Sequence, residues 1–289
     1  MFKNVHQLKK RSLALWMAIP LAILTVSCEL EDPPPFGRAG NQVRFAGRDW
    51  VVKTGPSPLG PGPNFYSDKP EDIFLDGQGY LHMRIAEHDG IWYATELVGQ
   101  DTVGYGEYTW VIAGDYENIP VNTVLGLFTW NTESFQTQAN SEVDIELAKW
   151  GNVNTKPLHT GVQPVNEDVN ADPIIPYPER IREADTEAGD LIGVTTHQFI
   201  WTENVIIWKS WKGRGTGGEL IWQWSYSKSN PNNIPRVKKE NGNSSDPIVI
   251  PKPENNTNVR MNHWLLGGIP PLDGQVQEAI IMDFTYVPY

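Results

Sequence analysis

The sequence of 289 residues has little cysteine, little helical periodicity and no long apolar segment, and each absence excludes a class of structure. The single cysteine, Cys28, excludes a disulfide framework. After residue 28 no amphipathic helix longer than about two turns is predicted. The apolar run 13–26 is too short to span a membrane comfortably. Stability must therefore come from a hydrophobic core, and the residues after position 27 are numerous enough for one large domain.

Positive charge is also in short supply. The chain has 23 Lys and Arg against 35 Asp and Glu, which gives a formal net charge of −12. Residues 1–27 hold four basic and no acidic side chains, so the remainder is near −16. Because like charges repel at long range, nucleic acid is excluded as a partner and a strongly polyanionic substrate is disfavoured. A local basic cleft can still override the second conclusion.

The N-terminus has the pattern of an export signal. Four basic side chains precede the apolar run, which ends at Thr25-Val26-Ser27-Cys28. Small residues before a cysteine resemble a bacterial lipobox, in which the cysteine is lipidated and becomes the new N-terminus. This resemblance implies a membrane anchor at Cys28. The alternative is an ordinary cleaved signal with a chance cysteine.

The segment behind Cys28 fits a surface lipoprotein. The acidic run 29–32 resembles a surface-export signal of Bacteroidetes-type lipoproteins, and three prolines at 33–35 indicate a semi-stiff tether. We predict a signal peptide at 1–27, a tether at 28–42 and one domain at 43–289. The expected location is the bacterial outer membrane, with the domain at the cell surface, and the expected state is a monomer.

The rest of the chain reads as nearly all β. Short apolar or alternating runs recur, separated by turn signals such as Asp89-Gly90. The clearest runs are 80–85, 108–112, 142–147, 199–201, 205–208, 220–224 and 279–286. Many short strands with Gly and Pro turns predict a β-sandwich or barrel.

The most informative run is Ser141-Glu-Val-Asp-Ile-Glu-Leu147. Successive side chains on a strand point to opposite faces, so Glu142, Asp144 and Glu146 share one face. Three like charges in a row destabilise a strand unless they have a use. Two neighbouring carboxyl groups are what retaining glycoside hydrolysis needs. The other interpretations are a solvated sheet face or half of a calcium site.

A family resemblance starts from this strand. Glu142-x-Asp144-x-Glu146 resembles the active-site strand of glycoside hydrolase family 16. Five further segments resemble family motifs and occur in the expected order: GYGEY at 104–108, LGLFTW at 125–130, HQFIWTENVI at 197–206, NHWLLGG at 262–268 and IIMDF at 280–284. The resemblance covers residues 43–289, apart from a polar insert at 227–259.

The resemblance implies a fold and a mechanism. The fold is a β-jelly roll, a concanavalin A-like sandwich of two curved antiparallel sheets with a concave substrate-binding face. Glu142 is the expected nucleophile and Glu146 the expected acid and base, with Asp144 tuning their protonation. The Cα atoms of the two glutamates lie about 13 Å apart on an extended strand. Their side chains must therefore lean together, because retention needs carboxyl groups about 5–5.5 Å apart.

The spacing of the acidic motif also suggests a substrate. Its uninterrupted form resembles the lichenase and xyloglucan-active branches of the family, which implies a glucan with β-1,4 bonds. No cofactor is expected for catalysis. Similar family members bind a structural calcium, for which Asp283 is a candidate ligand.

Sugar-binding side chains are expected around the acidic strand. The chain has 12 Trp, whose flat rings with a polar edge suit stacking on sugars, although about half are expected in the core. Trp130 and Trp150 are the leading platform candidates. Further candidates, each with a structural alternative, are Trp264, Trp92, His159, Gln163 and Asn64.

Two other functions remain open from the sequence. The first is a non-catalytic surface glycan-binding lipoprotein on the same fold, which the Trp content and the lipid anchor suit equally well. The carboxylate triad disfavours it, because a binder does not need three clustered charges. The second is a structural or adhesive jelly roll whose acidic strand binds calcium.

Overall fold

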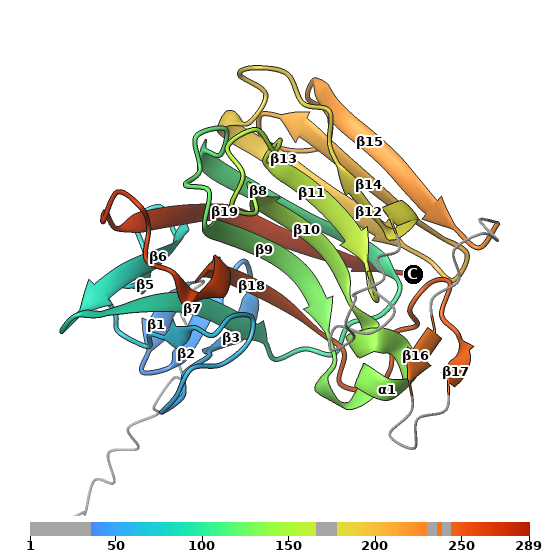
Figure 1. Cartoon of the computed structure of the whole chain (residues 1–289), viewed down its shortest axis with the longest axis horizontal. Coiled ribbons are helices and arrows are strands. Elements are labelled where there is room, and N and C mark those ends of the chain that lie inside the picture. Colours follow the sequence, from blue (N-terminus) through green and yellow to red (C-terminus); the bar gives the residue numbers. More distant parts are fainter. Residues whose placement is uncertain (1–35, 166–177, 230–235, 239–243) are drawn as a thin grey trace, which may run out of the picture. The chain divides into compact units, whose positions relative to one another are not determined.

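The computed structural model describes residues 36–165, 178–229, 236–238 and 244–289 (Figure 1). The predicted signal peptide, the lipidation site Cys28 and the tether up to residue 35 lie outside the described residues. The strands are β1 (Gly37–Ala39), β2 (Gln42–Phe45), β3 (Arg48–Val52), β4 (Phe65–Tyr66), β5 (Ile73–Leu75), β6 (Leu81–His88), β7 (Ile91–Gly99), β8 (Gly106–Asp115), β9 (Thr123–Trp130), β10 (Val143–Ala148), β11 (Leu158–Val162), β12 (Ile181–Glu183), β13 (Ile192–Trp201), β14 (Val205–Lys212), β15 (Leu220–Ser227), β16 (Arg236–Lys238), β17 (Ser244–Pro247), β18 (Asn258–Leu265) and β19 (Gln277–Pro288).

Apart from β16 and β17, which pair only with each other, these strands form two layers of one curled, almost entirely antiparallel sheet. In one layer the order is β12-β11-β10-β9-β18-β7-β3-β2-β1. In the other it is β15-β14-β13-β8-β19-β6-β5. The layers join because β6 pairs with β19 at its start and with β7 at its end. The predicted all-β jelly roll is confirmed.

The alternation in the sequence decides which residues enter the core. On β10, Val143, Ile145 and Leu147 are at most 1% exposed and pack between the layers. The opposite face of the strand is thereby left to the carboxylates. Four tryptophans are also fully buried in this core: Trp50, Trp110, Trp201 and Trp208. The expectation that many Trp serve the core is met by these four.

Local turn chemistry also follows the sequence. Asp89 and Gly90 connect β6 to β7 with φ of 54° and 81°, the left-handed pair that a tight two-residue hairpin requires. The α-helix among the described residues is a four-residue turn, α1 (Phe135–Gln138). None of the described helices is long and apolar enough to cross a membrane.

The folded domain begins earlier than the predicted boundary at residue 43. β1 starts at Gly37 and pairs with β2. Arg38 donates hydrogen bonds to the backbone carbonyls of Lys69 (3.1 Å) and Ile73 (2.5 Å). These contacts fasten residues 37–39 to the sheet, so the predicted tether is too long at its C-terminal end. The acidic and proline residues from which the tether was predicted do not reveal a strand of only three residues.

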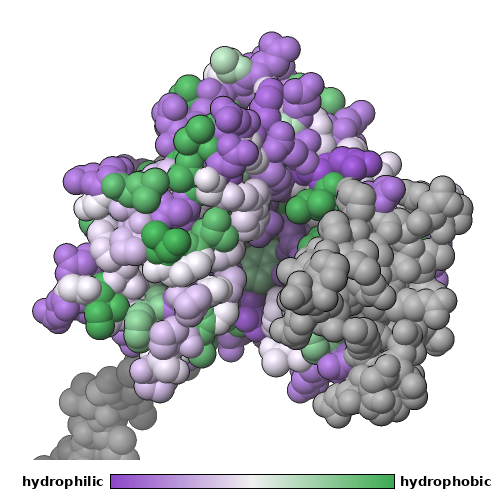
Figure 2. Space-filling model, viewed as in Figure 1, coloured by the Kyte–Doolittle hydropathy of each residue, from purple (hydrophilic) through white to green (hydrophobic). Residues whose placement is uncertain are grey.

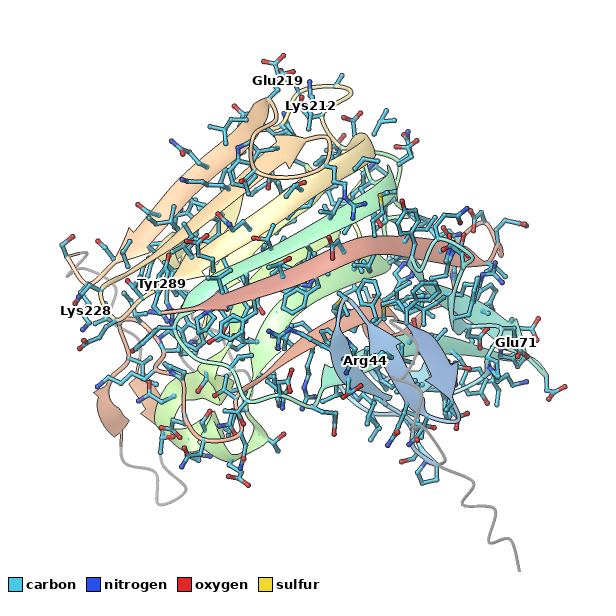
Figure 3. The ribbon with its side chains drawn as sticks, turned by 180° about the vertical axis from the view of Figure 1, so that it is seen from behind. Arg44, Glu71, Lys212, Glu219, Lys228 and Tyr289 are labelled. Atoms are coloured by element: carbon cyan, nitrogen blue, oxygen red, sulfur yellow. The ribbon has the colours of Figure 1, made fainter. Side chains whose placement is uncertain are left out.

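The charged side chains lie mainly at the ends and on the outer surfaces of the strands. Seen from behind, Lys212 and Glu219 meet where β14 turns into β15, with Nζ 3.5 Å from Oε1 (Figure 3). Lys212 also pairs with Asp190 at 2.9 Å. Exposed pairs of this kind contribute little to stability.

Candidate active site

Strand register brings the three carboxylates onto the floor of a cleft. Asp144 lies directly between Phe128 on β9 and Gly161 on β11, and Glu146 lies between Gly126 and His159. Directly opposed residues in an antiparallel sheet point to the same face. We call this face of β7, β9, β10, β11 and β18 the cleft face. It is the side turned toward the viewer in Figure 1.

A cavity of about 450 Å³ lies on the cleft face. Figure 2 shows hydrophilic and hydrophobic residues intermixed around a hollow on the same side of the molecule. The cavity is lined by Lys53, Leu59, Gly60, Pro61, Glu96, Gly126, Phe128, Trp130, Thr132, Glu142, Asp144, Glu146, Arg260, Asn262 and Trp264. It therefore contains all three carboxylates of the acidic strand, together with aromatic and cationic side chains.

Burial raises the pKa of all three carboxyl groups. Burial, followed by the charges of Asp144 and Glu146, raises the pKa of Glu142 well above its usual value, while Arg260 lowers it. Burial raises the pKa of Asp144 to about 7, against hydrogen bonds from Gln163 and Glu142. Burial and the Asp144 charge raise the pKa of Glu146. The site therefore retains protons at neutral pH.

A segment with a strained backbone directly precedes Glu142. Ala139, Asn140 and Ser141 have φ of 47°, 61° and 53°, a left-handed conformation that costs energy for residues with a side chain. Thr129 fixes the exit: its hydroxyl donates to the carbonyl of Ser141 (2.9 Å) and accepts from the N–H of Val143 (3.1 Å). These bonds hold the backbone on both sides of Glu142. The sequence shows no signal for this segment.

The predicted platform residue Trp130 lines the cavity. It is half-buried at the end of β9, and its indole N–H donates to the Thr132 hydroxyl at 3.1 Å. Trp264 also lines the cavity but is only 8% exposed, and it packs in a small apolar cluster with Tyr66 and Val124. Trp130 is the ring better placed to meet a ligand.

Trp150 does not line the cavity. β10 ends at Ala148, and Trp150 lies beyond it with a φ of 50°. The alternation of β10 therefore does not extend to Trp150, and this predicted platform residue lies outside the cavity lining. Its ring instead packs edge-on against Trp264 and His159, with centroids 6.1 and 6.0 Å apart.

The two predicted residues on β11 and just beyond it have different surroundings. His159 lies opposite Glu146 but is 6% exposed and outside the cavity lining, and burial lowers its pKa. Gln163 donates from Nε2 to Oδ2 of Asp144 at 3.1 Å. Gln163 thus hydrogen-bonds the central carboxylate, whereas His159 is buried next to Glu146 and packs against the Trp150 ring.

Asn64 is a structural residue, not a lining residue of the cleft. It is 2% exposed, and its side chain accepts from the N–H of Leu265 (3.1 Å) and donates to the carbonyl of the same residue (2.9 Å). A further bond joins it to the carbonyl of Pro61 at 2.9 Å. Asn64 therefore pins the loop 59–61 against β18, and that loop forms one wall of the cavity.

Trp92 and Asp283 lie away from the cavity. Trp92 is half-buried near the start of β7. Asp283 pairs with Arg214 at 3.2 Å, so its carboxylate is engaged. Within the described ranges no group of three or more His, Cys, Asp or Glu side chains is arranged to hold a metal ion. A structural calcium stays a prediction.

Ten of the lining residues were not singled out from the sequence, and four of these ten carry charged or amide side chains: Lys53, Glu96, Arg260 and Asn262. On β18 the polar side chains alternate with apolar ones from Asn258 to Asn262, and this alternation could have revealed two of them. Asn262 is 2% exposed, and a Cβ on Gly126 would lie 2.4 Å from its Oδ1. Glycine at 126 therefore makes room for this amide beside Glu146.

Comparison with known proteins identifies the fold. No family model and no curated protein matches the sequence. Among solved structures, a β-glucanase from Bacillus licheniformis is similar at 15% identity, over 87% of this chain and 94% of that chain, with a TM-score of 0.52. A family 16 glycosyl hydrolase from Mycobacterium smegmatis is 16% identical over 89% and 96%, with a TM-score of 0.50.

A third structure limits what this likeness means. It is described as an immunostimulatory antigen and pseudo β-1,3-glucanase of Mycobacterium tuberculosis, and it is 15% identical over 82% of this chain and 89% of that chain, with a TM-score of 0.51. At this level of identity the likeness establishes the fold alone. The chain thus has the β-jelly-roll fold of glycoside hydrolase family 16, and its activity must be inferred from its own residues.

Proposed function

We propose that this protein is a retaining endo-β-glycosidase that hydrolyses a β-linked polysaccharide, with a β-glucan as the favoured substrate. The observation that carries this proposal is the set of three carboxyl groups with raised pKa on the floor of one cavity, of which Asp144 is buried and the two glutamates are partly buried. Such a cluster is costly to a fold unless the groups have a chemical role. The shared fold with a bacterial β-glucanase supports the choice of glucan.

The reactive form needs one ionised and two protonated carboxyl groups. Glu142 must be ionised to attack, and Glu146 must be protonated to act as an acid. The pKa of Asp144 is about 7, so this group can keep its proton near neutral pH while Glu142 is ionised. The nearby Arg260 favours the ionised form of Glu142. Mutual repulsion thus assigns opposite protonation states to the two glutamates.

The chemistry then proceeds in two displacements. A carboxylate oxygen of Glu142 attacks the anomeric carbon, the glycosidic C–O bond breaks, and Glu146 gives its proton to the leaving oxygen. Glu146, now ionised, takes a proton from water as that water attacks the same carbon. The bond to Glu142 breaks, and the product retains its anomeric configuration. Trp130 supplies a surface on which a sugar ring can stack beside the reacting bond.

Isosteric variants test the roles of the glutamates. Glu142→Gln should abolish cleavage of a β-glucan while leaving folding and glycan binding nearly unchanged. Glu146→Ala should retain part of its activity on an aryl glycoside with a good leaving group, since such a group needs little protonation. Glu107→Gln, on β8 in the other layer, is a matched control and should cleave normally. Wild-type turnover by Glu142→Gln would contradict the assignment.

A binding protein on the same fold is the second candidate, because a similar structure is described as a pseudo β-1,3-glucanase. A screen of purified protein lacking residues 1–28 against plant, fungal and algal polysaccharides separates the two. Binding without any release of reducing ends, in the wild type and in Glu142→Gln alike, would favour the binding protein. In either case we propose a lipid anchor at Cys28 and an outer-membrane location.

A further inference from the structure

The wall of the cleft opposite the acidic strand carries two cations around one carboxylate. Glu96 on β7 is 1% exposed. Its Oε2 lies 2.8 Å from Nζ of Lys53, and its Oε1 lies 3.1 Å from Nη1 of Arg260. Both cationic side chains are mostly buried, with 18% and 16% of their surface exposed, and both line the cavity. This wall therefore has one positive charge more than Glu96 neutralises.

The fold uses part of this charge: Nζ of Lys53 donates to the carbonyl of Gly60 at 2.5 Å and lies 4.2 Å from the centre of the Tyr66 ring, and Arg260 lowers the pKa of Glu142. One cation would suffice to pair with Glu96, and withdrawing a second from water costs free energy. Burial lowers the pKa of Lys53, which is the sign of that cost. The chain beyond residue 27 has a strong excess of acidic residues, so two cations on one cavity wall are unusual for this protein.

Part of the Arg260 guanidinium is free to meet a ligand. Its Nε donates to Oδ1 of Asn258 at 3.1 Å and its Nη1 donates to Glu96. In the portion of the chain that the structure describes, its Nη2 has no hydrogen-bond partner. The guanidinium carbon lies 5.5 Å from the centre of the Trp130 ring. A sugar stacked on Trp130 would thus have the guanidinium at its edge.

The charge of Arg260 reaches Glu142, whose pKa it lowers, but Arg260 lies apart from the central carboxylate Asp144. Arg260 and Asp144 pair with Phe128 from opposite sides, so their backbones are two strand spacings apart, about 10 Å. Glu96 lies one strand further along the sheet, on β7, and Lys53 follows the end of β3, which pairs with β7. An anion held between Lys53 and Arg260 would therefore be shielded from Asp144 by the Phe128 ring.

We propose that Lys53 and Arg260 form a subsite for one anionic substituent, a carboxylate or a sulfate ester, on a sugar unit seated beside Trp130. This proposal rests on the proposed glycan-binding function and narrows its substrate class to a polysaccharide with occasional acidic groups. Arginine is suited to the task, because its planar fork forms charge-assisted hydrogen bonds with both oxyanions. A neutral glucan would leave Nη2 of Arg260 without a charged partner.

The experiment measures binding without cleavage. Frontal affinity chromatography over immobilised Glu142→Gln ranks a neutral β-gluco-tetraose against mixtures of its singly oxidised and singly sulfated isomers. At least one anionic isomer should bind about tenfold more tightly than the neutral tetraose. Raising the salt from about 0.05 to about 0.5 M should reduce that advantage. The better of the two anions identifies the substituent.

A second variant assigns the effect to the proposed residue. Arg260→Met in the Glu142→Gln protein should bring the ratio of anionic to neutral affinity, measured within that one protein, close to one. Arg214→Met removes an ion-paired arginine on the loop after β14 and should change neither affinity. If Arg260→Met does not fold, the ranking on Glu142→Gln alone decides. Equal binding of all tetraoses would overturn the anionic subsite and keep the glycosidase; no binding of any would count against both.

Discussion

Asp144→Asn should make the protein more stable at neutral pH and flatten the dependence of its stability on pH. The pKa of Asp144 is raised from 3.8 to about 7 in the folded state, chiefly by burial. Each pKa unit corresponds to about 1.36 kcal/mol, so ionising this group costs the folded state about 4 kcal/mol at about pH 8. Asparagine keeps the shape and can still accept the bond from Gln163.

The sign follows from proton binding. A raised carboxyl pKa means that the native state binds more protons than the unfolded state, so stability falls as pH rises. The free energy of unfolding should be highest below about pH 4 and decline until about pH 7, the folded value. Between about pH 4.5 and about pH 8 the loss from Asp144 alone amounts to about 3 kcal/mol. The neighbours Glu142 and Glu146 add to it, because the Asp144 charge also raises their pKa values.

Urea denaturation at a series of pH values and constant ionic strength measures this dependence. The difference between wild type and Asp144→Asn isolates the effect of the Asp144 charge, both its own ionisation and its influence on Glu142 and Glu146. Asp76→Asn is the control, because desolvation of Asp76 is outweighed by hydrogen bonds from Tyr80, His82 and Gln78, so its pKa is lowered. The raised pKa of Asp144 would be refuted if the free energy of unfolding of the wild type stayed flat or rose with pH over this range. An equal slope against pH in Asp144→Asn would refute it too.

Three further predictions concern residues around the cleft and the anchor. Trp130→Ala should raise KM on a soluble glucan with little change in melting temperature. Trp264→Ala should instead lower the free energy of unfolding by about 3–5 kcal/mol in urea denaturation, because Trp264 is only 8% exposed. The reverse pattern would make Trp130 the core residue. Asn64→Ala should lower the free energy of unfolding by about 1–3 kcal/mol, because it leaves the backbone of Leu265 without partners, and a neutral result would mean that water replaces them. Cys28→Ala should move the full-length protein from the detergent phase to the aqueous phase; partitioning of both forms into the aqueous phase would exclude a lipid anchor.

Periodicity explains which parts of the site were predictable. On β10 the alternation of Glu142, Asp144 and Glu146 with apolar residues placed the carboxylates on one face, and the observed register does so too. The same alternation does not reach Trp150, because β10 ends at Ala148 and Trp150 itself has a left-handed backbone conformation. Parity holds only while the strand continues, and strand ends are set by contacts with neighbours.

The sequence by itself determined the all-β class, the jelly roll through its ordered motifs, and the shared face of the three carboxylates. These features depend on short-range alternation and turn chemistry, which a linear pattern records. Only the tertiary structure decided that Lys53, Glu96 and Arg260 face the acidic strand across one cavity. These residues come from the segment after β3, from β7 and from β18, respectively. It also decided that Asn64 holds a loop to Leu265, about two hundred residues away in the chain. Such contacts depend on the order in which strands pair, and no local property of the chain encodes that order.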